Sequence, residues 1–282
     1  MKKLITTCLV VVLFGVGYVR ADGMWTTLDF PGANNSEVRA ISGNNVVGVY
    51  TDSSGNELYG YLYSGSFWIT LTYPGAVSTI ANAISGNNIV GWTNNAEGYG
   101  GLSFLYNGTT YTPLNCPGSA YGISGNNVVG YYYDSSGNAQ GLLYNLTTQG
   151  WTALPIVATG IDGSNVTGGN QVYNITTKSL TTLDFPGSNG TQANAISGNN
   201  VVGVYKDSSG NWNGFLYDGT TYTTLDYPGA TSTWVNDISG SSIVGWYTDS
   251  SNVQHGFIYT TPEPATLLLL GLGGIMLSRR KK

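Results

Sequence analysis

The stretch Ile41-Ser-Gly-Asn-Asn-Val-Val-Gly48 decides how this chain folds, because the chain repeats it along its length. Further copies begin at Ile84, Ile123, Ile196 and Ile238, and a diverged copy fills Ile161–Gly168. Successive leading isoleucines are 43, 39, 38, 35 and 42 residues apart. A period near 40 residues is typical of one supersecondary unit copied in tandem. The sequence therefore predicts six structural repeats.

Each unit has the pattern of four short strands. In the first unit the strands end at Ile41 or span 46–51, 59–63 and 67–73, and turn residues such as Ser42–Asn45 separate them. Val46–Thr51 alternates so that both faces of the strand are apolar, which predicts that both faces are covered. Four antiparallel strands in about 40 residues, apolar on both faces, are the pattern of a β-propeller blade.

The ends of the repeat region are out of phase. Trp25–Gly32 matches the fourth strand of a unit, as in Tyr222–Gly229, whereas Ile238–Tyr259 supplies only the first three strands. A ring gains from this arrangement, because the N-terminal strand completes the last blade and leaves no open edge. We predict an all-β fold for residues 22–260, a six-bladed β-propeller closed in this way. The fourth unit, Ile161–Gly187, lacks the usual long turn, so it is predicted to be the shortest blade.

The first 21 residues have the pattern of a signal peptide. Lys2 and Lys3 precede an apolar run, Leu4–Val19, and Val19-Arg-Ala21 offers small residues for cleavage after Ala21. We therefore expect signal peptidase to act on residues 1–21 and the product to be exported. The alternative is a retained membrane anchor.

The last segment, residues 261–282, has the pattern of a sorting signal with a short transmembrane segment. Pro262, Glu263 and Pro264 precede an apolar run of 13 residues, Ala265–Leu277, and the chain then carries Arg279, Arg280 and two lysines. The run is shorter than the roughly 20 residues that span a bilayer, and the basic residues fit a cytoplasmic flank. The membrane is therefore expected to be a partner only through this tail, before processing.

This tail resembles the PEP-CTERM sorting signal of Gram-negative bacteria. The resemblance rests on Pro262-Glu-Pro264, on the glycines at positions 271, 273 and 274 in the apolar run, and on the terminal basic cluster. It implies that an exosortase recognises and removes the tail, after transient anchoring in the inner membrane. It also implies a secreted protein of the cell surface or extracellular matrix, associated with exopolysaccharide or biofilm.

The charge of the body argues against nucleic acid as a partner. Residues 22–261 hold 3 basic and 14 acidic side chains, a formal charge of 3 − 14 = −11. Such a surface repels phosphate backbones and anionic lipid. It attracts cations or basic partners instead.

The sequence offers little for catalysis, and we predict no enzymatic activity, no cofactor and no metal site. The single histidine, His255, is expected at a turn or strand edge. Motifs of serine hydrolases, zinc proteases and phosphate-binding loops are absent. Turns that begin at Asp52, Asp134, Asp207 and Asp249 are expected to stabilise hairpins, with weak cation binding as the alternative. Asp29, Asp184 and Asp226 are expected to cap strand ends.

A candidate ligand site follows from the residues expected near the propeller axis. The residue before the leading isoleucine is small in five units, and Asp237 places a carboxylate there in the sixth. The ligand site predicted from this region consists of Asn82, Asn194, Trp234, Asn236 and Asp237. Aromatic and amide groups suit stacking on a sugar and hydrogen bonding to it, so polysaccharide is the expected ligand. A polysaccharide hydrolase or lyase, which needs a second carboxylate, and a protein-interaction scaffold are the alternatives.

The units also resemble the HAF-type extracellular repeat. The matching segments are Ile196–Asn199, Val129–Tyr132 (as Val-Gly-Tyr) and Gly214–Tyr217. The resemblance implies extracellular placement and no defined catalytic activity. Together, the observations favour an exported, non-enzymatic propeller with a structural or binding role.

Overall fold

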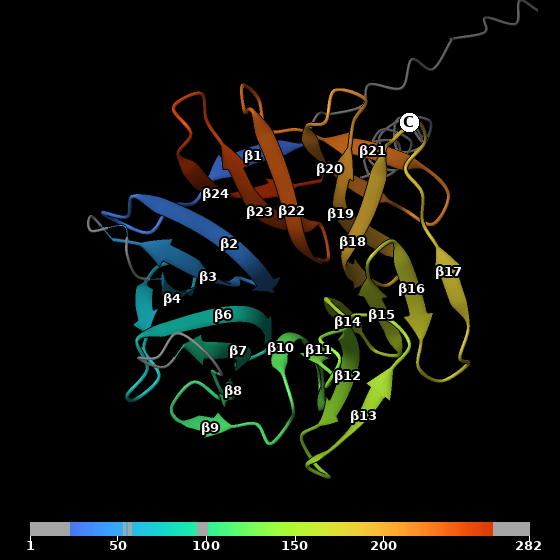
Figure 1. Ribbon diagram of the computed structural model, residues 1–282. Coiled ribbons are helices and arrows are strands. Elements are labelled where there is room, and N and C mark those ends of the chain that lie inside the picture. Colours follow the sequence, from blue (N-terminus) through green and yellow to red (C-terminus); the bar gives the residue numbers. More distant parts are fainter. Residues whose placement is uncertain (1–22, 53–54, 56–57, 95–100, 262–282) are drawn as a thin grey trace, which may run out of the picture. The chain divides into compact units, whose positions relative to one another are not determined.

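Each repeat folds into one four-stranded antiparallel sheet, and six such sheets surround a common axis in the computed structural model (Figure 1). The structure describes residues 23–261 except for 53–54, 56–57 and 95–100. Within these residues, Met24–Thr261 forms one compact unit built from 24 strands. The predicted six-bladed β-propeller of four-stranded antiparallel blades is thus confirmed.

The first three blades are contiguous in sequence. Blade 1 contains β2 (Asn35–Ser42), β3 (Asn45–Thr51), β4 (Leu58–Tyr63) and β5 (Trp68–Leu71). Blade 2 contains β6 (Ser78–Ser85), β7 (Asn88–Asn94), β8 (Ser103–Tyr106) and β9 (Tyr111–Pro113). Blade 3 contains β10 (Ser119–Ser124), β11 (Asn127–Tyr133), β12 (Ala139–Asn145) and β13 (Gly150–Leu154).

The last three blades include the shortest one and the one that closes the ring. Blade 4 contains β14 (Gly160–Asp162), β15 (Asn165–Gly168), β16 (Gln171–Asn174) and β17 (Leu180–Thr182), each of three or four residues as predicted. Blade 5 contains β18 (Gly190–Ser197), β19 (Asn200–Lys206), β20 (Trp212–Tyr217) and β21 (Tyr222–Leu225). Blade 6 contains β22 (Ser232–Ser239), β23 (Ser242–Thr248), β24 (Gln254–Thr260) and β1 (Met24–Thr27).

Both faces of the central strands are buried, because neighbouring blades pack against each other. In β3, Val46, Val47 and Val49 are at most 1% exposed. The fully buried Tyr61 of β4 packs in one cluster with Val46 and with Val244 of blade 6. Gly48 lies where a side chain would overlap the Glu37 carbonyl oxygen, so the Val-Val-Gly motif ends in glycine because the strands approach too closely for a Cβ. Burial on both faces is why a blade needs its neighbours.

The N-terminal strand closes the ring. β1 pairs antiparallel with β24, with Trp25 opposite Tyr259 and Thr27 opposite Phe257. The ring centroids of Trp25 lie 5.0 Å from Phe257, 4.5 Å from Tyr259 and 5.4 Å from Tyr227. Blade 6 is therefore built from both ends of the propeller, as the out-of-phase ends predict.

The innermost strand of each blade bends toward the axis. In blades 1, 2, 3, 5 and 6 the pairing of the first two strands shifts by one residue at a β-bulge. The residue in the bulge stands two positions before the leading isoleucine of the repeat. These residues, which we call the bulge residues, are Arg39, Asn82, Tyr121, Asn194 and Asn236, with Thr159 at the equivalent position of blade 4. A bulge re-aims a side chain, and here it positions the site.

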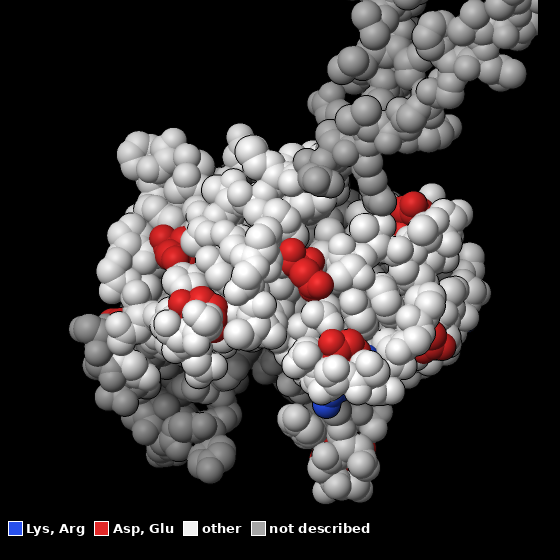
Figure 2. All heavy atoms as spheres, turned by 90° about the horizontal axis from the view of Figure 1, so that it is seen from above, with Lys and Arg blue, Asp and Glu red and all other residues white. Residues whose placement is uncertain are grey.

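Two predicted segments lie outside the described residues. These are the signal peptide at 1–21 and, from residue 262 onward, the sorting signal with its short apolar run. Within the described part of the chain, no helix is long and apolar enough to cross a bilayer. Figure 2 shows the propeller surface from above, where acidic side chains are scattered over a mostly uncharged surface.

Candidate functional site: the axial channel

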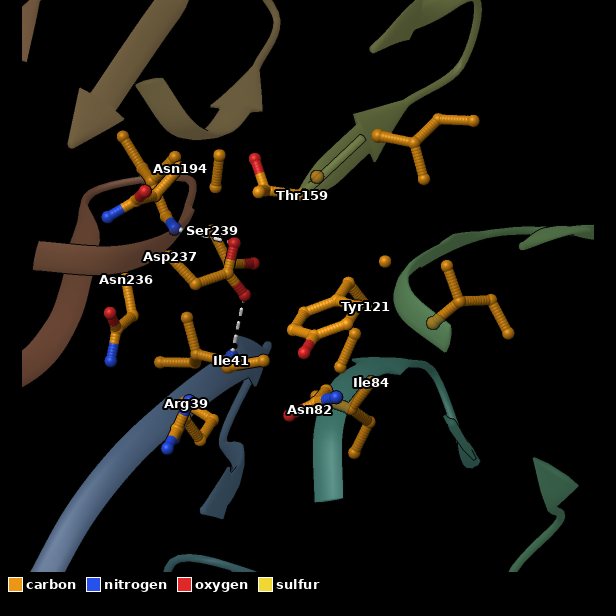
Figure 3. A pocket seen from close by; sticks show the side chains of 18 of the residues that line it. Arg39, Ile41, Asn82, Ile84, Tyr121, Thr159, Asn194, Asn236, Asp237 and Ser239 are labelled. Carbon is orange, nitrogen blue, oxygen red and sulfur yellow. Dashed lines mark hydrogen bonds between the residues drawn. The ribbon is translucent and has the colours of Figure 1, made fainter. Parts of the chain in front are cut away.

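The innermost strands of all six blades surround a cavity of about 430 Å³ on the axis, which we call the axial channel (Figure 3). A cavity of this size falls within the range of small-molecule sites. The five predicted ligand residues, Asn82, Asn194, Trp234, Asn236 and Asp237, all line it. The structure thus brings together residues that are up to 155 positions apart in sequence.

Four of the six bulge residues link their own blade to the next one. Each one donates to the backbone carbonyl three positions before the leading isoleucine of the following repeat. The bonds are Asn82 Nδ2 to Ala120 O (2.8 Å), Thr159 Oγ1 to Ala193 O (3.1 Å), Asn194 Nδ2 to Val235 O (2.7 Å) and Asn236 Nδ2 to Val38 O (2.7 Å). The three asparagine amide nitrogens therefore serve the fold. Asn194 Oδ1 accepts from Gln192 Nε2 at 2.9 Å, so the Oδ1 atoms of Asn82 and Asn236 are the groups that can meet a ligand.

Arg39 and Tyr121 occupy the same ring but make different contacts. Arg39 Nη2 lies 2.7 Å from Glu37 Oε2 within the same strand. Its Nε is buried and has no hydrogen-bond partner among the described residues. The Tyr121 ring stacks on Tyr131 at 4.9 Å, and their hydroxyl oxygens are 3.1 Å apart. Figure 3 shows the Tyr121 side chain projecting into the channel. These two residues therefore depart from the interblade role of the other four.

Tryptophans form one wall of the channel in blade 6. Trp234 and Trp246 face each other across β22 and β23, with parallel rings 5.4 Å apart at 5°. Both line the channel and both are half-buried. Trp212 of blade 5 extends the cluster, 5.2 Å from Trp234. An aromatic surface of this kind suits flat apolar faces of a ligand.

Asp237 connects blade 6 to blade 1 at the channel. Its Oδ2 accepts a hydrogen bond from the Ile41 amide at 2.8 Å and its Oδ1 accepts one from the Ile238 amide at 2.8 Å. Burial raises the pKa of Asp237 to about 7, the two amide hydrogen bonds oppose the rise, and the charge of Asp162 adds to it. The carboxyl group is therefore partly protonated near neutral pH.

Asp237 shares the channel with other carboxylates that the repeat pattern did not predict. Asp162 and Glu37 also line the cavity. Asp162 Oδ2 accepts a hydrogen bond from the Gly198 amide of the next blade at 2.8 Å, so it serves the fold as well. Glu37, Arg39, Tyr121 and Trp246 were absent from the predicted site. Alignment of the repeats could have found Glu37, Arg39 and Tyr121, because each differs from the residue at the same position in every other blade. Trp246 has a counterpart in Trp92 of blade 2.

The aspartates of the long turns accept hydrogen bonds from their own loops. Asp134 Oδ1 accepts from the Ser136 and Asn138 amides, and Asp207 Oδ1 accepts from the Ser209 and Asn211 amides. These backbone bonds lower the pKa of both carboxyl groups. The geometry agrees with hairpin stabilisation. Among the described residues, no group of three or more histidine, cysteine or acidic side chains is suited to a metal ion.

His255 lies at the second position of β24, next to the turn that precedes this strand, and it has acidic neighbours that the sequence did not predict. Its Nδ1 lies 2.7 Å from Asp29 Oδ2 and its Nε2 lies 3.6 Å from Asp249 Oδ2, and it stacks on Tyr247 at 5.1 Å. Asp29 Oδ1 also accepts from the Gly256 amide at 3.0 Å. Asp29 follows β1, so this histidine joins the two chain ends that build blade 6. Both of its ring nitrogens face carboxylates.

The geometry defines a six-bladed propeller with an axial channel, and comparison with known proteins indicates where the cell sends it. Residues 260–282 match the PEP-CTERM protein-sorting motif. That signal implies an exported, exosortase-processed protein of the Gram-negative cell surface with a transient membrane anchor. No curated protein matches the sequence. The resemblance of the repeats to the HAF type stays a prediction.

Solved structures share the fold at low sequence identity. TolB from Acinetobacter baumannii matches with a TM-score of 0.54 and 13% identity over 77% of this chain, which spans 64% of that protein. The β-propeller domain of the Trilobed protease from Pyrococcus furiosus matches with a TM-score of 0.49 and 12% identity over 82% of each chain. An Aleuria aurantia lectin in complex with Fucalpha1-6GlcNAc matches with a TM-score of 0.48 and 13% identity over 84% of this chain and 95% of that one. At these identities the likeness concerns the fold alone.

Proposed function

We propose that the mature protein is a non-enzymatic binding module of the cell surface or extracellular matrix, and that it binds polysaccharide in the axial channel. Its association with exopolysaccharide or biofilm is part of this proposal. Export and exosortase processing bring the propeller to that location. Signal peptidase is the proposed partner at the other end of the chain.

One observation carries the proposal: residues that depart from the repeat gather around the channel. Where other repeats have asparagine or threonine, blades 1 and 3 have Arg39 and Tyr121. At the position where blades 1 and 5 have valine, blade 6 has Trp246 and blade 2 has Trp92. The fold does not need an arginine, a tyrosine or a tryptophan at these two positions, because blade 5 has Asn194 and Val204 there. Residues that the fold does not require, grouped around one cavity, support a binding site.

The test uses substitutions that restore the residue type of the repeat. Arg39→Asn, Trp234→Gln and Trp246→Val each install a side chain that another blade carries at the same position. These variants should keep the thermal stability of the parent protein and lose glycan retention on an array at physiological salt. Trp151→Tyr, on the exposed outer strand of blade 3, is the matched control. Retention that is unchanged in all three channel variants would reject the channel as the site.

A polysaccharide hydrolase or lyase is the second candidate, and one observation favours it. Asp162 and Asp237 line the same cavity, and the charge of Asp162 contributes to the raised pKa of Asp237. Glycosidases use two carboxyl groups about 5–10 Å apart, one of them with a raised pKa. Release of reducing or unsaturated ends from a polysaccharide, abolished in Asp237→Asn, would establish this activity. Against it, both carboxyl groups already accept backbone hydrogen bonds between blades.

A protein-interaction scaffold is the remaining candidate. It predicts that outer-membrane proteins, and no glycan, are recovered with the tagged full-length protein after cross-linking. The same recovery from the Arg39→Asn variant would place such a partner outside the channel.

A further inference from the structure

The two aromatic surfaces of the axial channel lie in opposite blades. Trp234 and Trp246 belong to blade 6, and Tyr121, stacked on Tyr131, belongs to blade 3. In a ring of six, blades 3 and 6 face each other across the axis (Figure 1). A sugar ring that enters the channel therefore meets an aromatic face on either side. Such faces contribute through apolar contact and are indifferent to hydroxyl stereochemistry.

The polar groups between these surfaces are mostly hydrogen-bond acceptors. The amide nitrogens of Asn82 and Asn236 are bound to the next blade, so their Oδ1 atoms remain to accept. Glu37 adds a carboxylate. Arg39, whose side chain lines the channel and is 34% exposed, is the complementary donor. A hydroxyl group both donates and accepts, so it can satisfy both kinds of group.

The charge of the channel penalises an anionic ligand. The guanidinium of Arg39 is already paired with Glu37 at 2.7 Å. Asp162 and Asp237 add negative charge, and no further basic side chain lines the cavity within the described residues. The body of the protein carries a formal charge of −11 (3 basic and 14 acidic side chains). A ligand carboxylate would lose its hydration without finding an unpaired cation.

Resting on the proposed function, we infer that the channel selects an uncharged, hydroxyl-rich polysaccharide and discriminates against polymers that carry carboxylate or sulfate groups. The aromatic surfaces of blades 3 and 6 hold the sugar ring. Arg39, Glu37 and the asparagine oxygens bind its hydroxyl groups. The ion pair between Glu37 and Arg39 sets the discrimination, because it removes the one cation that could attract an acidic sugar.

The experiment is affinity electrophoresis of the exported protein through gels containing a neutral glucan or alginate, at about 0.05 and 0.5 M NaCl. The neutral glucan should retard the protein at least 10-fold more strongly than alginate at both salt concentrations. Trp234→Gln should lose this retardation, and Trp151→Tyr should keep it. Glu37→Gln, which leaves Arg39 unpaired, should raise retardation by alginate about 10-fold at low salt and less at high salt.

The outcomes separate this inference from the proposed function. Equal or stronger retardation by alginate, lost in Trp234→Gln, would overturn the selectivity while leaving glycan binding in place. No retardation by any polymer would reject both. Failure of Glu37→Gln to change binding of alginate, with its thermal stability intact, would overturn the role of the ion pair.

Discussion

Blades 5 and 6 contain the same aromatic cluster, but only in blade 5 do all members of the cluster come from one continuous stretch of chain. In blade 5, Tyr222 contacts Phe185, Phe215 and Tyr217 at 5.4, 5.7 and 4.5 Å. In blade 6, Trp25 contacts Tyr227, Phe257 and Tyr259 at 5.4, 5.0 and 4.5 Å. The packing is the same although more than 200 residues separate Trp25 from its partners. Packing geometry is thus set by the repeat, whereas the connection of the chain decides what holds the blade together.

A second difference concerns one polar position. In blade 5, Asn213 Nδ2 lies 3.5 Å from Asp207, and burial followed by the charge of Asp207 raises the pKa of Asp226. In blade 6, His255 stands at the position of Asn213, between Asp249 and Asp29. The closing blade therefore has a cation-capable side chain where the contiguous blade has an amide. The single histidine of the chain lies at the one place where two distant segments must stay paired.

Truncation of the closing aromatic residue should have the largest effect. Trp25→Ala should lower the free energy of unfolding by about 3 kcal/mol, because it removes the side chain that anchors β1 on β24. Tyr222→Ala, its counterpart in blade 5, should cost about 2 kcal/mol, since the chain on both sides still holds β21. Urea denaturation monitored by tryptophan fluorescence measures both. Equal losses would mean that chain connection adds nothing to blade stability.

The fold was predictable from the repeat because a period near 40 residues and two apolar faces per strand leave few architectures. Closure followed from the phase of the two ends: Trp25–Gly32 matches a fourth strand, and the register of β1 on β24 agrees. The repeat did not predict the contacts between distant copies of the unit. The link between His255 and Asp29 spans 226 residues and depends on how the last turn of blade 6 approaches the end of β1.

The site was predictable in position but not in the roles of its atoms. Asn82, Asn194 and Asn236 line the channel as expected, yet their amide nitrogens bind the next blade. This role depends on the β-bulge, a feature of strand pairing that the pattern of residues does not reveal. Arg39 and Tyr121 were not predicted because they do not recur: the equivalent position holds asparagine or threonine in the other four blades.

The axial carboxylate of blade 6 should make stability depend on pH in a way that blade 5 does not. The pKa of Asp237 is raised to about 7, so the folded state holds its proton more tightly than the unfolded chain does. Its contribution is therefore most favourable below about pH 4 and is lost as pH rises to about 7, a change of about 1–2 kcal/mol after screening. Asp237→Ala, which installs the Ala195 of blade 5, should remove this dependence.

Thermal melts between about pH 4 and pH 8 measure the effect. Relative to the parent, Asp237→Ala should gain stability toward pH 8. The reverse change, Ala195→Asp, should introduce the same dependence into blade 5. A constant difference between parent and Asp237→Ala at every pH would contradict the assignment of the titration to this carboxyl group.

Exchange of the polar residues between the two blades should have a smaller effect. His255→Asn removes the partner of Asp29 and should cost about 1 kcal/mol. Asn213→His places an imidazole between Asp207 and Asp226 and should stabilise blade 5 by a similar or smaller amount. Both effects should shrink when NaCl is raised from about 0.05 to 0.5 M, since screening weakens partly exposed pairs. A loss in His255→Asn that is independent of salt would indicate packing on Tyr247 as the cause.

Substitution of the turn aspartates should have the smallest effect on stability. It tests whether blades 5 and 6 differ only where the two chain ends pair. Asp207 and Asp249 both accept two loop amides, and these backbone bonds lower the pKa of each carboxyl group. Their contribution is therefore present above about pH 4. It is lost as pH falls through the lowered pKa. Replacing either by alanine should lower Tm only above that range.

The two variants should nevertheless be distinguishable. Asp249 also faces His255 Nε2 at 3.6 Å, whereas Asp207 Oδ2 lies 3.5 Å from the side-chain amides of Asn211 and Asn213. Asp249→Ala should thus cost more than Asp207→Ala in the parent protein and the same amount in a His255→Asn background. A double-mutant cycle isolates that difference, because the loop amides cancel between the blades. A difference that survives the loss of the histidine would place the distinction in the turns themselves and not in the pairing of the chain ends.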